Sequence, residues 1–157
     1  MTNARSTPTP LPQGYKPLEN TAQPDPAIRS RYQSVIGSLL YIMLGTHPNI
    51  AYAVTKLSQF TVNPLCEHLD KALYICRYLA GTSNYALVYD GPSNKGLIAY
   101  TDSDWAQDPI KRRSVTGYFF KLANGIISWQ SHSQKTVALS STEAEYMALS
   151  DCSRQAI

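Results

Sequence analysis

The amino-acid sequence predicts an α+β protein, in which an N-terminal arm and a three-helix segment precede an antiparallel three-stranded sheet with one further helix. Three observations support this fold class. Apolar residues recur at helical spacing between residues 26 and 79. After Gly81, short apolar runs bounded by turn residues replace that spacing, as is typical of strands. An acidic helix-capping pattern then follows Ser140.

The composition indicates a protein with a hydrophobic core. Of the 157 residues, 43% are apolar, and the formal net charge of +3 permits contact with nucleic acid without requiring it. The three cysteines form no pair at disulfide or metal spacing, and the N-terminus has no apolar signal core. The longest apolar run, residues 35–44, is shorter than the roughly 20 residues that cross a bilayer. We therefore expect an intracellular chain, in the cytoplasm or nucleus, that is not secreted and makes no membrane contact.

The N-terminal half is predicted to be an arm followed by helices. Residues 1–27 contain six prolines, a density that blocks helix and central strand, so an extended arm is expected there. Asp25 and Pro26 fit the N-cap and the first position of a helix, and residues 28–82 form the helical segment. The three predicted helices span residues 26–45, from residue 48 to about 60, and about 65–79.

The C-terminal half is predicted to be a small sheet and a helix. Residues 83–95 indicate a strand at 86–89 and then a turn, and residues 96–157 make up the next unit. Its predicted strands span residues 96–102, 115–122 and 126–130. The Asn124-Gly125 dipeptide is a strong hairpin signal between the last two strands. The final helix is expected from about residue 142.

Acidic residues gather at the two places where this sheet and this helix are expected to meet. Asp102 ends the first strand of the unit, Asp104 lies two residues further on, and Glu143 lies in the first turn of the helix. Carboxylates that a sheet and a helix bring together are what a divalent metal ion requires. Glu145 is about 200° around the helix from Glu143, so both cannot face one metal, and spacing alone does not choose between them. The alternative, in which all four acids are helix caps or solvated surface groups, stays open on spacing alone.

An ordered set of motifs resembles the C-terminal part of a copia-type LTR retrotransposon polyprotein. The matching segments are Tyr32-Gln33-Ser34-Val35-Ile36-Gly37-Ser38-Leu39-Leu40-Tyr41, Pro48-Asn49-Ile50-Ala51-Tyr52-Ala53-Val54, Arg77-Tyr78-Leu79-Ala80-Gly81-Thr82, Tyr100-Thr101-Asp102-Ser103-Asp104-Trp105-Ala106, Arg113-Ser114-Val115-Thr116-Gly117-Tyr118 and Ser140-Ser141-Thr142-Glu143-Ala144-Glu145-Tyr146. Each match is weak alone, but the ordered set is highly specific and covers roughly residues 28–157.

The resemblance implies a fold and an ancestral activity. Residues 28–82 resemble the thumb and connection of a reverse transcriptase, and residues 96–157 resemble a truncated ribonuclease H-like domain. That family cleaves the RNA strand of an RNA–DNA hybrid with two magnesium ions held by four acidic residues. Its first two acids, which are catalytic and bind the metal, fall on Asp102 and Glu143. Asp104 and Glu145 match common family residues outside that pair.

The remaining catalytic groups of the family have no counterpart in this sequence. The third and fourth acids are expected beyond the final helix, Asp151 lies on that same helix, and no polymerase Tyr-x-Asp-Asp motif occurs. We therefore expect weak or absent magnesium binding and no hydrolysis by this chain alone. Lack of a fourth strand would leave the strand that carries Asp102 at a sheet edge, which favours self-association.

A basic cluster indicates contact with the RNA–DNA hybrid that the family binds. The candidate residues are Lys111, Arg112, Arg113, Ser114 and Thr116. The alternative is a solvated start to the hairpin. His132-Ser133 stand where the family often has consecutive lysines, which would weaken a phosphate contact. At the level of the whole chain, the alternative to an inactive polyprotein fragment is a domesticated, non-enzymatic module that binds nucleic acid or protein.

Overall fold

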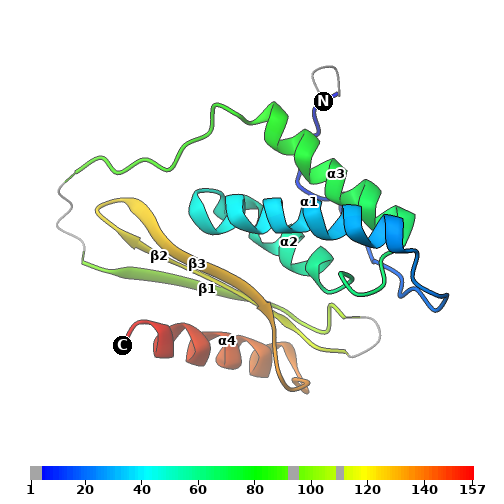
Figure 1. Cartoon of the computed structure of the whole chain (residues 1–157). Helices are drawn as coiled ribbons and strands as arrows, with labels where there is room; N and C mark the ends of the chain where they lie inside the picture. Colours follow the sequence, from blue (N-terminus) through cyan, green and yellow to red (C-terminus); the bar gives the residue numbers. More distant parts are fainter. Residues whose placement is uncertain (1–4, 92–95, 109–111) are drawn as a thin grey trace. The chain divides into compact units, whose positions relative to one another are not determined.

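A computed structural model describes residues 5–91, 96–108 and 112–157, and it confirms the α+β class (Figure 1). The elements in chain order are α1 (Pro26–Gly45), the short 3₁₀ helix η1 (Pro48–Ile50), α2 (Ala51–Ser58), α3 (Cys66–Gly81), β1 (Ile98–Asp104), β2 (Val115–Leu122), β3 (Gly125–Ser133) and α4 (Ser141–Gln155). The chain divides into two compact units at Ala86/Leu87. No helix in the described ranges has the length and hydrophobicity that crossing a membrane requires.

The first unit is built on α1, α2 and α3. The Asp25 side chain accepts hydrogen bonds from the backbone N–H groups of Ala27 (2.8 Å) and Ile28 (3.3 Å), which confirms the predicted N-cap of α1. Buried side chains from all three helices and η1 form the core, among them Tyr32, Ile36, Leu39, Ile50, Val54, Leu57 and Ile75. The buried Tyr32 hydroxyl donates to the Leu57 carbonyl at 2.6 Å, so its polar end is satisfied within that core.

The proline-rich arm contains no helix or strand between residue 5 and Asp25, as expected. It docks on the same unit through side chains. The Asn63 amide donates to the carbonyls of Asn20 and Ala22, and the Thr7 hydroxyl donates to Tyr74 O. The contacts hold the arm against the helices without a regular hydrogen-bond ladder.

The prediction of a strand at residues 86–89 is wrong. Residues 85–90 have no regular secondary structure, and the sheet order β1-β2-β3 gives them no neighbouring strand. A strand exists only where a partner completes its hydrogen bonds. The segment is held instead by the Tyr89 hydroxyl, which donates to Ile126 O at 2.7 Å. The rest of the predicted turn, residues 92–95, lies outside the described residues.

The second unit contains a three-stranded antiparallel sheet in the order β1-β2-β3. The predicted hairpin between β2 and β3 forms, but its turn is shifted by one residue. Leu122 pairs with Gly125, and the two turn residues are Ala123 (φ 48°) and Asn124 (φ 62°). Positive φ at both positions is the type I′ geometry whose twist matches the strands, and Gly125 already belongs to β3.

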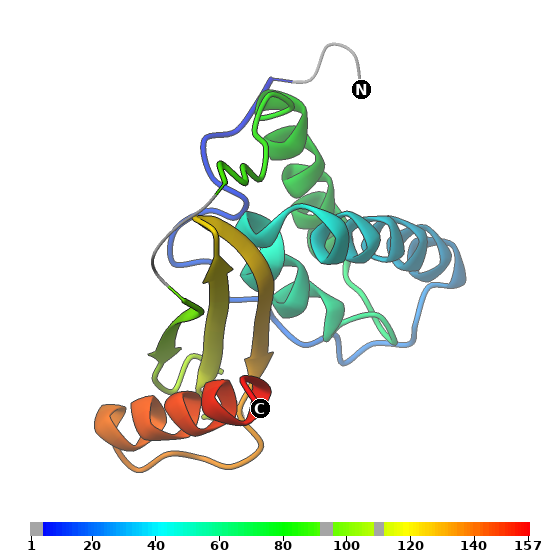
Figure 2. The same cartoon turned by 90° about the vertical axis from the view of Figure 1, so that its left-hand side faces the viewer.

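Helix α4 covers one face of this sheet, as Figure 2 shows. Alternate residues of β2, namely Thr116, Tyr118 and Phe120, are buried on that face. Tyr118 and Phe120 pack with Cys152 of α4 in a small core. The helix therefore has one buried side, built from Ala144, Ala148 and Cys152.

Candidate functional site

The strand register determines the side of the sheet on which Asp102 lies. Asp102 pairs with Gly117, whereas its neighbours Thr101 and Ser103 pair with Tyr118 and Thr116. Directly paired residues share a face, and successive residues alternate between faces. Because Tyr118 and Thr116 are buried on the face that α4 covers, Asp102 projects from the opposite face.

The Glu143 carboxylate accepts a hydrogen bond at the N-terminus of α4. Its Oε2 accepts a hydrogen bond from the backbone N–H of Leu139 at 2.6 Å. The Ser140 hydroxyl accepts from the backbone N–H of Glu143 at 3.1 Å, so the capping pattern predicted from the sequence forms with Leu139 as the second donor. Among the described residues no hydrogen bond joins Asp102 to Glu143, and the strand register assigns Asp102 to the face opposite α4.

The two neighbouring acids do not complete a metal cage. Asp104 pairs with Val115 and shares the open face with Asp102, and its side chain is exposed. Glu145 is exposed on α4. Within residues 5–91, 96–108 and 112–157, no group of three or more His, Cys, Asp or Glu side chains is placed to hold a metal ion.

The basic cluster lies at the turn between β1 and β2. Lys111 is outside the described residues. Arg112 is exposed, and Asp108 forms backbone hydrogen bonds with Arg112 and Arg113 that close the turn. Ser114 and Thr116 are fully buried: the Ser114 hydroxyl accepts from Ala106 N–H, and the Thr116 hydroxyl accepts from Gln134. Among the described members of the cluster, the predicted phosphate contact therefore depends on the arginines.

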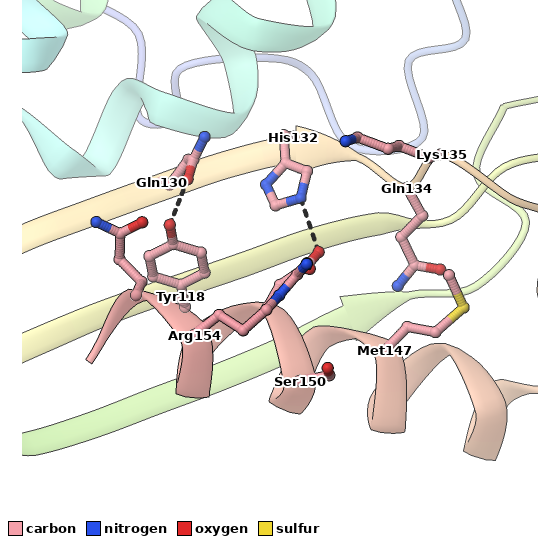
Figure 3. Close-up of a pocket in the computed structure, with 10 residues that line it drawn as sticks. Tyr118, Gln130, His132, Gln134, Lys135, Met147, Ser150 and Arg154 are labelled. Carbon is pink, nitrogen blue, oxygen red and sulfur yellow. Dashed lines mark hydrogen bonds and ion pairs between the residues drawn. The ribbon is translucent and has the colours of Figure 1, made fainter. Parts of the chain in front are cut away.

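A cleft that the sequence did not indicate lies between α4 and the β2–β3 half of the sheet (Figure 3). Its volume is about 600 Å³, within the range of small-molecule sites. Among the residues that line it are Tyr118, Gln130, His132 and Gln134 from the sheet side, and Met147 and Asp151 from the helix. All of these belong to the second unit.

A hydrogen-bonded cluster of His132, Asp151 and Arg154 lies in the lining of this cleft. His132 Nε2 lies 3.1 Å from Asp151 Oδ2, and the Arg154 guanidinium donates to Asp151 Oδ1. Burial opposes ionisation of Asp151, but the hydrogen bonds and charges of Arg154 and His132 outweigh it and lower the pKa of this carboxyl. The sequence signal at this place is His132, which departs from the resembled family, and no sequence motif marks Asp151.

Comparison with known proteins shows the ancestry of the chain. It is 45% identical over 126 residues to the secreted RxLR effector protein 161 of Plasmopara viticola, which covers 80% of this chain and 89% of the effector. It is 42% identical over 163 residues to the retrovirus-related Pol polyprotein from transposon TNT 1-94 of Nicotiana tabacum, and 43% identical over 126 residues to that from transposon RE1 of Arabidopsis thaliana. These matches cover 100% and 80% of this chain but only 12% and 8% of the polyproteins.

No protein-family model and no solved structure matches the chain, so the assignment depends on these relatives. The level of identity and the share of the effector that is covered are sufficient to establish common descent. The chain is therefore homologous to this effector over most of the effector's length, and to one segment of retrovirus-related Pol polyproteins from transposons.

Proposed function

We propose that this chain derives from the part of a retrotransposon polyprotein that joins the end of a reverse transcriptase to the beginning of its ribonuclease H domain, and that it does not cleave an RNA–DNA hybrid by itself. The observation that carries the second statement is the placement of its two best candidate acids. Asp102 projects from the open face of the sheet, whereas Glu143 caps a helix on the other face. A metal ion shared by two carboxylates needs their oxygens to converge within about 2.5 Å of it, and placement on opposite faces disfavours that convergence.

The described residues do not fit the two-magnesium site that the resembled family uses. Such a site needs several convergent carboxylates to balance two doubly charged ions and to orient the attacking water. In this chain, one of the candidate carboxylates already accepts a backbone hydrogen bond. A catalytic unit whose carboxylates do not converge loses several orders of magnitude in rate, so we expect no measurable turnover by the residues of this chain.

A cleavage assay tests this proposal. The purified chain is incubated with a labelled RNA–DNA hybrid in magnesium or manganese buffer, beside the Asp102→Asn, Glu143→Gln and Glu145→Gln variants. The expected result is the same background for all four proteins. Magnesium-dependent cleavage that Asp102→Asn abolishes would contradict the proposal. The glutamate variants would then show which residue of α4 takes part.

A second candidate function is binding without catalysis. A relative of nearly the same length, 89% of which is covered by the match, is named as an effector rather than as a polyprotein, which favours a module that acts alone. We expect such a module to contact nucleic acid through Arg112 and Arg113, which flank the β1–β2 turn. Affinity for a hybrid should then fall steeply with added salt and in the Arg112→Gln/Arg113→Gln variant. Binding that neither salt nor this variant changes would rule out the contact.

Self-association is a further expectation for the sheet. Among the described strands, β1 has one neighbour, β2, so its other edge offers backbone groups to another chain. A strand from a second copy of this chain could pair with that edge of β1. Sedimentation velocity over a hundredfold range of concentration should show a concentration-dependent dimer, and a monomer throughout would exclude it.

A further inference from the structure

The first unit contains a fully buried histidine, His68, in the first turn of α3. Its ring stacks on that of Phe60, with the two centroids 4.2 Å apart, and the centroid of the Tyr32 ring lies 6.4 Å away. An imidazolium cation at this place would be surrounded by aromatic side chains instead of water. Burial of this kind opposes the charged form of the ring.

The hydrogen bond that His68 makes requires the neutral ring. Its Nδ1 accepts the backbone N–H of Leu65 at 3.1 Å, so the ring proton lies on Nε2. The Nε2 atom is buried and has no hydrogen-bond partner in the described part of the chain. Protonation of Nδ1 would replace the acceptor by a second donor and would place a cation at the positive end of the helix. It would therefore remove the side-chain cap at the start of α3.

The groups around His68 only partly offset the cost of its protonation. Burial lowers the pKa of the ring below its ordinary value of 6.5, and the Glu67 carboxylate and the Leu18 backbone oppose that fall without reversing it. Tyr32 of α1 brings no charge, because burial raises the pKa of its hydroxyl. The contact of Leu18 with the ring also shows that the proline-rich arm reaches His68.

The arm is anchored at this end of α3 by further residues. The Tyr15 ring centre lies 5.2 Å from the Lys71 amine, and Pro17 is buried. The Tyr15 hydroxyl is neutral, because burial and then the Glu67 carboxylate raise its pKa to about 12. His68 and Lys71 are three positions apart on α3 and so are neighbours on its surface. Lys71 therefore adds a like charge beside an imidazolium.

We propose that His68 is a pH-sensitive latch, which holds the arm and the first turn of α3 against the rest of the first unit while its ring is neutral and releases both when the ring is protonated. A group that binds a proton more readily in the released form makes the docked form less stable as the pH falls. The docked form keeps its full stability above about pH 6.5. Below that value, the ratio of docked to released chains falls by up to about tenfold for each pH unit. The latch lies in the first unit and does not depend on the proposed function.

An NMR titration of the full chain from about pH 7.5 to about pH 4.5 tests the latch. The ring resonances of His68 should give a pKa below 6.5, and the amide resonances of residues 15–20 should move to unfolded positions with the same midpoint. The resonances of Ile36 and Leu39, in the buried core, should stay in place. A pKa of 6.5 or higher, an arm that stays docked while His68 titrates, or loss of the core in the same transition would overturn the proposal.

Three substitutions separate the His68 ring from its surroundings. His68→Gln keeps an acceptor for the Leu65 N–H but does not titrate, so the arm should stay docked over the whole pH range. Glu67→Gln removes the charge that favours the protonated ring, so release should move to lower pH. His47→Gln is the matched control, because His47 bonds the Thr46 hydroxyl instead, and it should leave release unchanged. Release of the arm by acid in His68→Gln to the same extent as in the unmodified chain would contradict the latch.

Discussion

Gln134 joins three parts of the second unit through a single side chain. It follows β3, contacts Thr116 of β2 and contacts the first turns of α4 through Ala144 O. Replacing it by the similarly shaped methionine removes both donated hydrogen bonds while preserving most of the volume. We expect Gln134→Met to lower the free energy of unfolding by about 1 to 3 kcal/mol, measured by urea denaturation. Gln155→Met, at the exposed end of α4, is the matched control and should change little. Equal effects of the two substitutions would show that the Gln134 bonds contribute no stability.

The Asp151 carboxylate should make the second unit sensitive to acid. A carboxyl whose pKa is lowered in the folded state contributes stability that is complete above its ordinary value of 3.8 and is lost as the pH falls through the lowered value. Urea midpoints measured between about pH 2 and 6 should therefore fall less for Asp151→Asn than for the unmodified chain. Asp104→Asn, which changes an exposed carboxylate on the other face, is the control. Identical pH dependence of Asp151→Asn and the unmodified chain would refute the prediction.

The sequence indicated which acids to consider but not the direction in which they point. In β1 the alternating sets are Tyr100, Asp102 and Asp104 on one face, and Ala99, Thr101 and Ser103 on the other. Neither set is a clear apolar stripe, so the pattern does not specify the buried face. That face is determined by β2, where Tyr118 and Phe120 alternate with less buried positions.

At the scale of elements, the turn between β2 and β3 contains a residue in an unfavourable backbone conformation. Ala123 has a φ of 48°, in the left-handed region that costs an alanine about 1 to 2 kcal/mol. Glycine adopts this conformation without that cost but loses more freedom on folding. We expect Ala123→Gly to raise the free energy of unfolding by about 0.5 to 1 kcal/mol, measured by denaturant titration.

A substitution of alanine by glycine that should lower stability is available in the same unit as a control. Ala148→Gly, at a fully buried position inside α4, should lower stability by about 1 kcal/mol or more because glycine is a poor helix former. Destabilisation by both substitutions would show that the turn does not have the proposed geometry.

Helices were easier to predict than strands in this chain. The bounds of α1 follow from local chemistry, because Asp25 and Pro26 define its start by contacts within four residues. The prediction of a strand at residues 86–89 failed because a strand needs a hydrogen-bonding partner elsewhere in the chain. The sequence of the segment itself does not show whether such a partner exists. The predicted turn, Asn124-Gly125, is one residue too late, because asparagine and glycine both tolerate the turn conformation. In the structure Gly125 pairs with Leu122, so the turn residues are Ala123 and Asn124.

The whole molecule has two cores, one in each unit, and they should respond separately to mutation. Leu57 is fully buried among the helices, and Phe120 is buried between the sheet and α4. Leu57→Ala should cost about 2 to 5 kcal/mol and reduce hydrogen-exchange protection mainly in α1 to α3. Phe120→Ala should reduce it mainly in β1 to β3 and α4. Equal loss of protection in both units from either substitution would contradict this division.

The cleft could not be predicted because it is a property of the whole second unit. Tyr118, His132 and Asp151 are separated by 14 and 19 positions along the chain, and no short motif relates them. They meet only because β2 and β3 pair and α4 then crosses the same face. The resemblance that indicated the fold gave no role to these residues.

The contact between Tyr89 and the hairpin imposes an order of assembly. Tyr89 donates to a carbonyl 37 positions later in the chain, on the strand that begins at Gly125, where any larger side chain would collide with the tyrosine ring. In a nascent chain, residues 87–91 therefore cannot make this contact until the β2–β3 hairpin has been synthesised and has formed. Until then residues 87–91 lack this hydrogen bond, and a pulse of proteolysis during refolding should cut there more readily than in the folded protein.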